Sequence, residues 1–490
     1  MNAHPLDKSR RIIERLIIEG ALVLETPTHL GNGDTDGIVD MPLLLDEATK
    51  AALLPGTSLA GALRNYLREH RNGFGASRPR TDKVVEGLFG AEKGNDKGSQ
   101  SALLIDDALA EKPRIELRDG VRIDPATRTA KIDFRDGRPR GYKYDYQLLE
   151  AGTTFNLRME LLLTENDDQV SLKKALATVL QGLEQGEIAI GLRKRRGFGR
   201  CKVNEWRVTC YDLTTSAGLL AWVAQDHPAW VTSSDCNPGA DIAQLLGVTI
   251  DKNEDQRNIC HLHAQFALDG SLLIRSGFGN QDQGPDTVHL HARQSNGERQ
   301  AILPGTSLAG VLRHRATRIL RTLGGSHVAV DQFIDAMFGP QEIQKGQRKG
   351  KASRLVVNET TVHAANELVQ NRIRIDRFTG GAYESALFNE QPVFGLSHTR
   401  IAIDLQLRNP RDSELGLLLL LLKDFWTGDL PLGGESSIGR GRLKGKEATV
   451  SVNRQELYRF QETSGSDLDI VGDRAKMENL VTALLKEVSS

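Results

Sequence analysis

This chain of 490 residues lacks the features that mark several large classes of protein. Its cysteines (Cys201, Cys210, Cys236 and Cys260) are widely spaced without a CxxC pair, which argues against a zinc site or a disulfide framework. They fit a reducing, cytoplasmic environment. No apolar run approaches the roughly 20 residues that span a bilayer, so we expect no membrane partner. The polar N-terminus, with Glu19 interrupting the next apolar stretch, indicates no signal peptide.

Net charge and known catalytic motifs are also lacking. The 63 Lys and Arg residues balance 64 Asp and Glu residues, so a nucleic-acid partner would have to be held by local basic patches. No Ser-His-Asp order, Walker loop, HExxH motif or Rossmann fingerprint occurs. The remaining composition is that of a folded globular protein of about two to four domains.

The strongest positive signal is a repeat of eight identical residues. The octapeptide LPGTSLAG at 54–61 returns at 303–310, which is 249 positions later. Further pairs follow in the same order: VEGLFG (85–90) with IDAMFG (334–339), GVRID (120–124) with RIRID (372–376), and GFGR (197–200) with SIGR (437–440). The sequence therefore predicts a tandem duplication of a unit of roughly 200 residues.

Each unit has the same expected order of elements. A β-rich opening is followed by a helix with a Ser/Thr N-cap, a strand, a long irregular segment, a second strand and a second apolar helix. In the first unit Leu59, Leu63 and Leu67, at positions i, i+4 and i+8, mark the first of these helices. This βαββαβ order predicts an α+β fold of two tandem ferredoxin-like units, an architecture shared by many RNA-recognition modules. We place the first unit at 1–203, a connector at 204–258, the second unit at 259–450 and a helical tail at 451–490.

Two turns in each unit have the chemistry for binding phosphate. The Pro-Gly-Thr-Ser turn presents backbone N–H groups at a helix N-terminus, where the helix dipole favours an anion. The glycine-rich turn at 191–200 carries five cations beside glycines that allow a phosphate to come close. Its counterpart at 433–442 keeps the glycines and loses cations. The alternatives are a tightly packed turn and a merely solvated basic loop.

Two basic stretches and several loop carboxylates add candidates. Arg114–Lys143 and Lys345–Arg354 are either mobile loops or binding arms. Loop aspartates near a phosphate site can bind a divalent metal or position a nucleophile, and the alternative is a turn-forming role, which we favour for Asp34. The other candidates are Asp36, Asp40 and Asp46 in the first copy and Asp282 and Asp286 in the second. His289 and His291, on one expected strand, are interpreted as surface residues.

Taken together, these motifs resemble the RAMP superfamily of CRISPR-associated proteins, and within it the backbone subunit of type III RNA-guided effector complexes. The motifs that carry the resemblance are GIVDMP at 37–42, the octapeptide with Leu63-Arg64, RDGVRID at 118–124, the GFGR turn, and RIDRFTG at 374–380. Two such units in one chain resemble the tandem backbone fusion of type III-D effectors.

The resemblance implies partners and a reaction. The partners are a guide (CRISPR) RNA, a target RNA and the other subunits of the effector complex. Such units stack along the guide, and the irregular insertion acts as a thumb that displaces a nucleotide. The family's Ile-Asp-x-Pro aspartate, required for metal-dependent cutting of target RNA, maps to Asp40. The expected cofactor is a divalent metal, Mg²⁺, bound mainly at the RNA, and its protein ligands stay open.

The second unit departs from this pattern. Counting back from Pro304 leads to Thr287 with Asp286 beside it, so Asp286 is the candidate catalytic residue and Asp282 the fallback. An inactive second unit is the alternative. The residues expected to bind RNA are Gly56, Thr57, Ser58, Arg64, Arg122, Arg193, Arg195, Arg196, Gly197, Phe198, Gly199, Arg200, Gly305, Thr306, Ser307, Arg313, Arg374, Gly439 and Arg440.

Two other functions compete with a target-RNA endonuclease. One is a non-catalytic, guide-binding scaffold. The other is a nuclease that processes precursor guide RNA, an activity that relies on a histidine near the first helix. Here only His29 and His70 are candidates for that role, and neither has a counterpart in the other repeat.

Overall fold

The first unit contains the predicted ferredoxin-like sheet. The computed structural model describes residues 11–34, 39–75, 82–91, 100–124, 127, 129–135, 138–224, 238–276, 284–340, 350–463 and 468–489. In its first sheet β1 (Ile12–Leu24) lies between β9 (Thr154–Thr164) and β10 (Cys201–Asp212), and β3 (Leu103–Ile105) flanks β9. All three pairings are antiparallel, which gives the strand order of a ferredoxin-like fold.

The second unit repeats this order. Strand β11 (Ile259–Asp269) lies between β23 (Arg400–Arg408) and β24 (Arg442–Val452), and β17 (Leu355–Val357) pairs with β23. The prediction of an α+β fold built from two tandem ferredoxin-like units is therefore confirmed.

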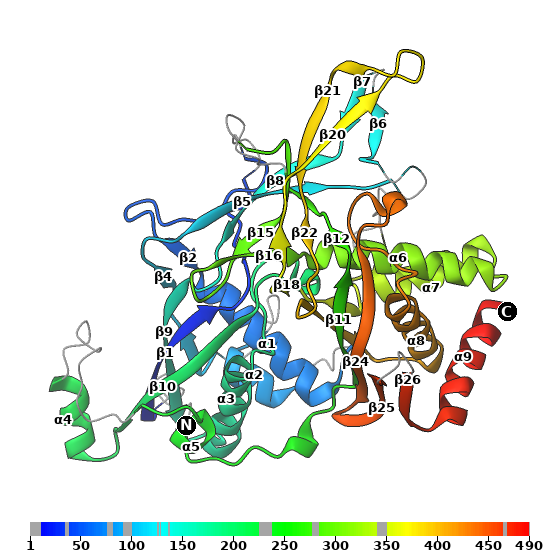
Figure 1. Ribbon diagram of the computed structural model, residues 1–490. Helices are drawn as coiled ribbons and strands as arrows, with labels where there is room; N and C mark the ends of the chain where they lie inside the picture. Colours follow the sequence, from blue (N-terminus) through cyan, green and yellow to red (C-terminus); the bar gives the residue numbers. More distant parts are fainter. Residues whose placement is uncertain are drawn as a thin grey trace.

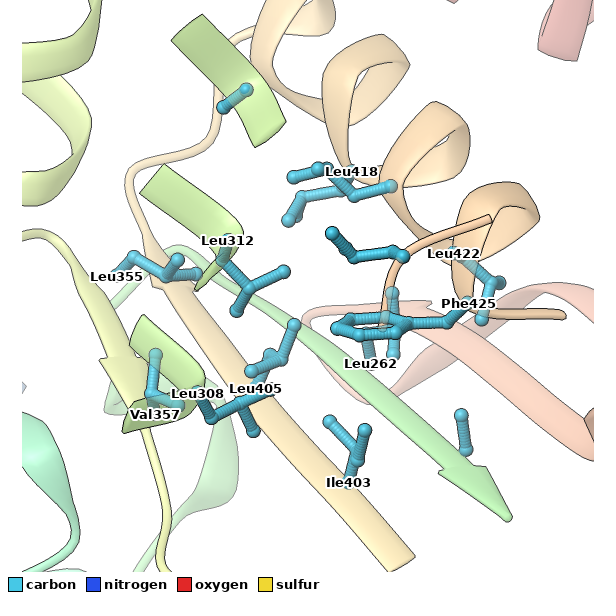
Figure 2. Packing of buried hydrophobic residues seen from close by; sticks show 14 of the residues in the cluster. Leu262, Leu308, Leu312, Leu355, Val357, Ile403, Leu405, Leu418, Leu422 and Phe425 are labelled. Carbon is cyan, nitrogen blue, oxygen red and sulfur yellow. The ribbon is translucent and has the colours of Figure 1, made fainter. Parts of the chain in front are cut away.

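One face of each sheet is covered by the two expected helices. These are α1 (Gly56–Asn72) and α3 (Gln169–Glu184) in the first unit, and α6 (Gly305–Thr322) and α8 (Asp412–Trp426) in the second. Leu59, Leu63 and Leu67 are buried at the predicted spacing along α1. Figure 2 shows the corresponding core of the second unit, where leucines of α6 and α8 meet the apolar side of β11 and β23.

The predicted Ser/Thr N-cap is wrong. Both helices begin at the glycine, with Pro55 and Pro304 at the N-cap and no side-chain cap. Thr57 and Ser58 therefore lie inside the first helical turn. Proline suits this boundary because its φ near −65° is compatible with entry into a helix and it needs no hydrogen-bond acceptor.

The segments expected to be irregular are largely β-hairpins. In the first unit β5 (Ile115–Val121) pairs with β8 (Lys143–Leu149), and β6 (Ile132–Arg135) with β7 (Arg138–Gly141). In the second unit β20 (Gln370–Ile375) pairs with β21 (Ala382–Gln391). Figure 1 shows these hairpins extending from the same end of the molecule. Residues 345–349 of the second basic stretch lie outside the described residues.

The predicted unit boundaries need correction. Strand β10 continues through 203 to Asp212, and the supposed tail adds β25 (Gln455–Glu462) and β26 (Leu468–Gly472) to the second sheet. Helix α9 (Arg474–Ser489) packs on α8, where a Cβ at Gly416 would come within 2.4 Å of the Leu480 carbonyl oxygen. The tail is therefore part of the second unit.

The remaining elements are short. The connector contains two short helices, α4 (Ser216–Ala224) and α5 (Ile242–Leu245). None of the helices in the described ranges combines the length and apolar character that a bilayer span requires. The other elements are α2 (Lys83–Phe89), α7 (His327–Phe338), β2 (Ala52–Leu54), β4 (Ala108–Ala110), β12 (Ser271–Leu272), β13 (Arg275–Ser276), β14 (Thr287–His289), β15 (His291–Arg293), β16 (Arg299–Leu303), β18 (Thr360–His363), β19 (Asn366–Glu367), β22 (Val393–Phe394), and the 3₁₀ turns η2 (Lys194–Arg196), η4 (Lys252–Glu254) and η5 (Ser436–Ile438).

His289 is a core residue and not the surface residue that we predicted. It is 1% exposed and lies between the Ile274 backbone N–H, 3.2 Å from Nδ1, and the Ile302 carbonyl oxygen, 3.0 Å from Nε2. His291 instead pairs with Glu367 at 2.7 Å. Burial lowers the pKa of His289 to about 4, below the ordinary value near 6.5.

We therefore expect acid to destabilise the second unit before its carboxylates titrate. Between pH 6.5 and 4 the unfolded chain binds a proton at His289 that the folded chain does not, so stability falls by up to about 3 kcal/mol as the pH drops through this window. Urea unfolding at several pH values measures this slope. His289→Asn should flatten it, and an unchanged slope in that variant would contradict the assignment.

Candidate nucleic-acid interface

A cleft of about 1290 Å³ lies between the two units. One wall consists of the outer side of α1, including Ser58, together with Asp40 and the glycine-rich loop of the first unit. The other wall is the open face of the second sheet, where His263 and Asp404 pair across β11 and β23 at 2.5 Å. The cations that line the cleft are Arg193, Lys194, Arg195, Arg200, Arg257 and Arg408. Five carboxylates also line the cleft (Asp34, Asp40, Glu69, Glu187 and Asp404), and Arg257 and Arg408 pair with Glu187 and Glu69. The local basic patch of the kind that nucleic acid requires is therefore the glycine-rich loop with Arg193, Lys194 and Arg195.

Asp40 is held at the rim of this cleft by Asp145 of β8. Asp145 donates its backbone N–H to Oδ2 of Asp40 at 3.0 Å, and Asp40 returns its own N–H to Oδ1 of Asp145 at 2.8 Å. The next residue, Met41, forms a parallel bridge with Tyr146. Asp40 is exposed, so its carboxylate is fixed in place but open to a ligand.

Asp286 occupies the same position in the second unit. Its Oδ2 accepts the backbone N–H of Asn389 in β21 at 2.8 Å, and the following Thr287 forms a parallel bridge with Glu390. The hydrogen bond and the bridge match those of Asp40 residue for residue, which agrees with the one-residue loop shift inferred from the sequence. The difference is the partner, because Asn389 stands where the first unit has the carboxylate of Asp145. Asp282 lies outside the described residues.

The carboxylates of the first unit fit a metal that is shared with RNA. No group of three or more His, Cys, Asp or Glu side chains in the described part of the chain is arranged to hold a metal alone. Asp40 and Asp145 each spend one oxygen on the reciprocal bonds, which leaves one oxygen on each. Mg²⁺ commonly binds through one or two carboxylates plus waters and phosphate oxygens, so this pair is sufficient only with a bound phosphate.

The glycine-rich loops correspond in a register that differs from our prediction. Arg193 and Glu435 both adopt left-handed backbone, with φ of 58° and 59°, immediately before a 3₁₀ turn. Gly197 and Gly439 follow in the same left-handed geometry. The GFGR turn therefore aligns with Gly439-Arg440-Gly441-Arg442 and not with SIGR. A two-residue shift is easily missed in a loop that shares only glycines.

This register reveals a chemical contrast between the units. Arg193 lies over the rings of Tyr144 and Tyr146, 4.8 Å from each centroid, and makes no ion pair with any described residue. Stacking fixes the guanidinium plane while its N–H groups stay available to a phosphate. Its counterpart Glu435 instead accepts from Arg275 at 3.0 Å within a cluster of ion pairs. The cluster also contains Glu390, Arg372 and Arg440.

The helix N-termini are less open than predicted. Gly56 donates its N–H to Oδ1 of Asp107 at 2.7 Å, so this amide already has an anionic partner. A Cβ at Gly305 would be 2.3 Å from the Arg196 carbonyl oxygen, so that helix start is packed against the first unit. Thr57 and Ser58 are exposed, whereas Thr306 and Ser307 are half-buried. Of the two predicted phosphate sites, only the first is accessible, and it is partly occupied by a carboxylate.

Several predicted RNA-binding residues have structural roles. Arg64 donates to the Gly90 carbonyl oxygen at 2.9 Å, and Arg313 makes the equivalent bond to Gly339 at 2.5 Å. Both arginines therefore tie the octapeptide helix to the end of the next helix. Their identity in the two copies reflects a shared packing contact and not a ligand.

Part of the glycine-rich loop is likewise buried. Phe198 is 1% exposed and packs against Tyr146, and Arg440 is 3% exposed within the ion-pair cluster. Arg196 donates to the Phe338 carbonyl oxygen at 3.2 Å in the second unit. Gly197 and Gly199 lie against backbone, where a Cβ would be 2.2 Å from Glu359 N and 1.8 Å from Ile190 O. These residues shape the loop and do not face the cleft.

The residues that remain accessible form a smaller set. Arg195 and Arg200 line the cleft, although Arg200 also pairs with Glu25 at 3.3 Å. Arg122 and Arg374 occupy corresponding places on the hairpins, each over a tyrosine ring, at 5.6 Å from Tyr142 and 4.7 Å from Tyr383. Gly439 has open space where a Cβ would stand.

The remaining candidates are the other loop aspartates of the first unit and the two histidines. Asp34 lines the cleft, whereas Asp46 accepts hydrogen bonds from Thr49 in a turn, and these bonds lower the pKa of Asp46. Asp36 lies outside the described residues. His29 is 5% exposed with Nδ1 at 2.8 Å from the Gln147 carbonyl oxygen, and His70 is 8% exposed. Burial lowers the pKa of His70. Neither histidine is placed as an open acid–base group.

Sequence reasoning missed Asp145, Asn389 and the tyrosines under Arg193. Asp145 lies 105 residues from Asp40, and nothing in the local sequence distinguishes it from other hairpin carboxylates. The alternation of Tyr142, Tyr144 and Tyr146 is the one signal that was available, since residues two apart lie on the same side of a strand.

The comparisons with known proteins agree with the fold and the repeat. The model of the RAMP superfamily matches residues 21–202 and 266–444, which together make up most of the chain. The chain therefore belongs to the RAMP superfamily, and both units carry the match. A curated relative is the CRISPR system Cms endoribonuclease Csm3 of Streptococcus thermophilus, which is 27% identical over 217 residues. That alignment covers 40% of this chain and 92% of the relative, so about one unit corresponds to the whole relative.

Proposed function

We propose that this protein is a guide-RNA-binding backbone subunit of a type III CRISPR effector complex. We propose further that it cuts target RNA and that Asp40 is its catalytic residue. The observation that carries the proposal is the placement of an exposed, backbone-anchored aspartate in the same cleft as the cationic loop that contains Arg193, within a RAMP unit. The name of the relative, which is an endoribonuclease, supports the reaction class.

The proposed reaction uses the target RNA's own 2′-hydroxyl. When a nucleotide is displaced from the duplex, its 2′-oxygen can align with the adjacent phosphorus. A new bond from the 2′-oxygen to phosphorus forms, the bond from phosphorus to the 5′-oxygen breaks, and a 2′,3′-cyclic phosphate results. Asp40 accepts the hydroxyl proton, and the leaving 5′-oxygen takes a proton from water. A divalent metal near Asp40 and Asp145 would neutralise charge on the phosphate.

The two units are not equivalent in this proposal. In the first unit Arg193 is free of carboxylate partners among the described residues and can hold a phosphate. In the second unit the place of Arg193 is taken by Glu435, and the three nearby arginines already pair with Glu390 and Glu435. We therefore propose that Asp286 supports cleavage poorly or not at all.

Cleavage maps of reconstituted complexes test these statements. Complexes carrying Asp40→Asn, Asp286→Asn or both are incubated with target RNA and Mg²⁺, and parallel reactions contain a chelator. We expect the cut assigned to the first unit to be lost with Asp40→Asn and with the chelator, and little change with Asp286→Asn. An unchanged map in the double variant would exclude both aspartates from the reaction, and absence of target-RNA cleavage by the unmodified complex would indicate a non-catalytic scaffold. If the isolated chain cut precursor guide RNA at a specific position, the result would favour the alternative function of a guide-RNA-processing nuclease.

The substitution Arg193→Glu places in the first unit the residue type that the second unit has at the corresponding position, Glu435. We expect cleavage at the first-unit site to fall by at least about tenfold, since removing one charge-assisted phosphate contact costs roughly 1.5–3 kcal/mol and the new carboxylate adds repulsion. Arg193→Lys should retain part of the activity. Leu192→Ala, at the exposed neighbouring position, is the control. Equal loss in Arg193→Lys and Arg193→Glu would point to a packing defect.

A further inference from the structure

The two units contribute different surfaces to their contact: the first contributes a loop, and the second contributes the edge of a strand. Arg196 donates to the carbonyl oxygens of Phe338 and Leu355, at 3.2 and 3.3 Å. Arg118 forms an ion pair with Glu359 at 2.6 Å. We call Arg118, Arg196 and Gly197 the loop face, and the segment from Leu355 to Glu359, which receives them together with the Phe338 carbonyl oxygen, the strand edge.

The repeat produces a second loop face that has no partner within the described chain. Gln370, Ile438 and Gly439 of the second unit correspond to Arg118, Arg196 and Gly197. Ile438 is 56% exposed. A Cβ at Gly439 would meet nothing within 4 Å, whereas one at Gly197 would be 2.2 Å from Glu359 N.

The repeat also produces a second strand edge, on the first unit. Leu104, Asp106 and Asp107 correspond to Val356, Asn358 and Glu359, since β3 and β17 pair with equivalent strands in the same register. Leu104 is 44% exposed, against 8% for Val356. The Asp106 side chain is 54% exposed, whereas Asn358 is buried. The strand edge is therefore covered in the second unit and exposed in the first.

The two open surfaces do not match each other in charge. The open strand edge carries two aspartates, of which Asp106 also pairs with Arg158 and Asp107 accepts from Gly56. The open loop face has Gln370 and Ile438 where the covered one has arginines. A copy of this chain would therefore bring an isoleucine and an amide to an acidic edge. Arg158 already balances Asp106, but Asp107 has no cation partner among the described residues, so covering it without supplying a cation is unfavourable.

We propose that the strand edge of the first unit is a docking surface for a different protein that presents a basic, glycine-rich loop, and that this chain does not assemble head-to-tail with its own copies. The inference rests on the proposed function only for the existence of a multi-subunit complex. The partner chemistry follows from the covered interface, in which the loop face supplies Arg118 and Arg196 and the edge supplies a carboxylate and carbonyl oxygens.

Grafting the covered interface onto the open one tests the proposal. Light scattering of the purified full-length chain should give a monomer mass at all micromolar concentrations. Gln370→Arg combined with Ile438→Arg supplies both missing cations, so we expect a mass that rises with concentration. Adding Leu104→Arg and Asp106→Lys, both at exposed positions, should restore the monomer. If Gln370→Arg disturbs folding through its neighbour Arg440, Ser437→Arg with Ile438→Arg at the exposed loop tip gives the same readout.

Two results would overturn the proposal. One is self-association of the unmodified chain that Leu104→Arg with Asp106→Lys abolishes. The other is a folded graft that stays monomeric. In the assembled effector, native mass spectrometry of the edge variant should show loss of one neighbouring subunit. RNA cleavage at Asp40 is measured separately, so a failure of the docking proposal and a failure of the cleavage proposal give different results.

Discussion

Replacing Asp40 with asparagine is expected to reduce target-RNA cleavage at one position by at least about a hundredfold while the complex still assembles. Proton transfer by a positioned side chain contributes roughly 10² to 10⁴ in rate, and an amide cannot accept the proton or ligate a metal well. Asparagine can still accept the Asp145 backbone N–H through its side-chain oxygen, so the loop should keep its place.

The design separates chemistry from position. Single-turnover cleavage of end-labelled target RNA gives the rate at each cut, and guide-RNA affinity is measured in parallel. Asp46→Asn is the matched control, because Asp46 is a nearby loop aspartate that only holds a turn. Asp145→Asn should cause a smaller loss, since its backbone N–H continues to hold Asp40. Full-rate cleavage in Asp40→Asn would remove Asp40 from the reaction.

The sequence was sufficient for the fold because its strongest signals are local or repeated. Leu59, Leu63 and Leu67 at helical spacing gave the first helix, and the order of landmarks gave the duplication. The hairpins β5–β8 and β20–β21 were taken for irregular segments because their residues are charged and half-exposed. Apolar and polar residues do alternate there, as at Arg372-Ile373-Arg374-Ile375, but the segments are so rich in charge that the alternation was outweighed, and Ile373 and Ile375 are exposed rather than packed in a core.

The site could be predicted only in part, for a different reason. Because Arg64 and Arg313 are identical in the two copies, we predicted that both bind RNA. In the structure each arginine instead donates a hydrogen bond to a backbone carbonyl oxygen, of Gly90 and Gly339 respectively. A shared residue reports a shared contact, and the sequence does not say whether that contact is internal. The contrast between Arg193 and Glu435 depends on tyrosines from a hairpin about fifty residues away, which only the folded chain brings under the loop.

Arg118→Ala is expected to be the most destabilising of the proposed changes, at about 3–5 kcal/mol. Arg118 is 3% exposed and lies between Glu116 of its own hairpin and Glu359 of the second unit. Burial raises the pKa of Glu116, and Arg118 opposes this effect. Without the guanidinium, two buried carboxylates face each other with no cation, so one must take up a proton or the units must separate.

Thermal and urea unfolding of the full-length chain measure this loss. Arg11→Ala is the matched control, because Arg11 and Glu165 form a well-exposed pair that should contribute less than about 1 kcal/mol. Adding Glu116→Gln and Glu359→Gln to Arg118→Ala should recover part of the stability, since neutral amides remove the repulsion. If Arg118→Ala alone behaves like Arg11→Ala, the buried ion pair does not join the units. Because Gly197 and Arg196 pack beside Arg118 at the same interface, the variant should also loosen the loop that carries Arg193 and weaken RNA binding.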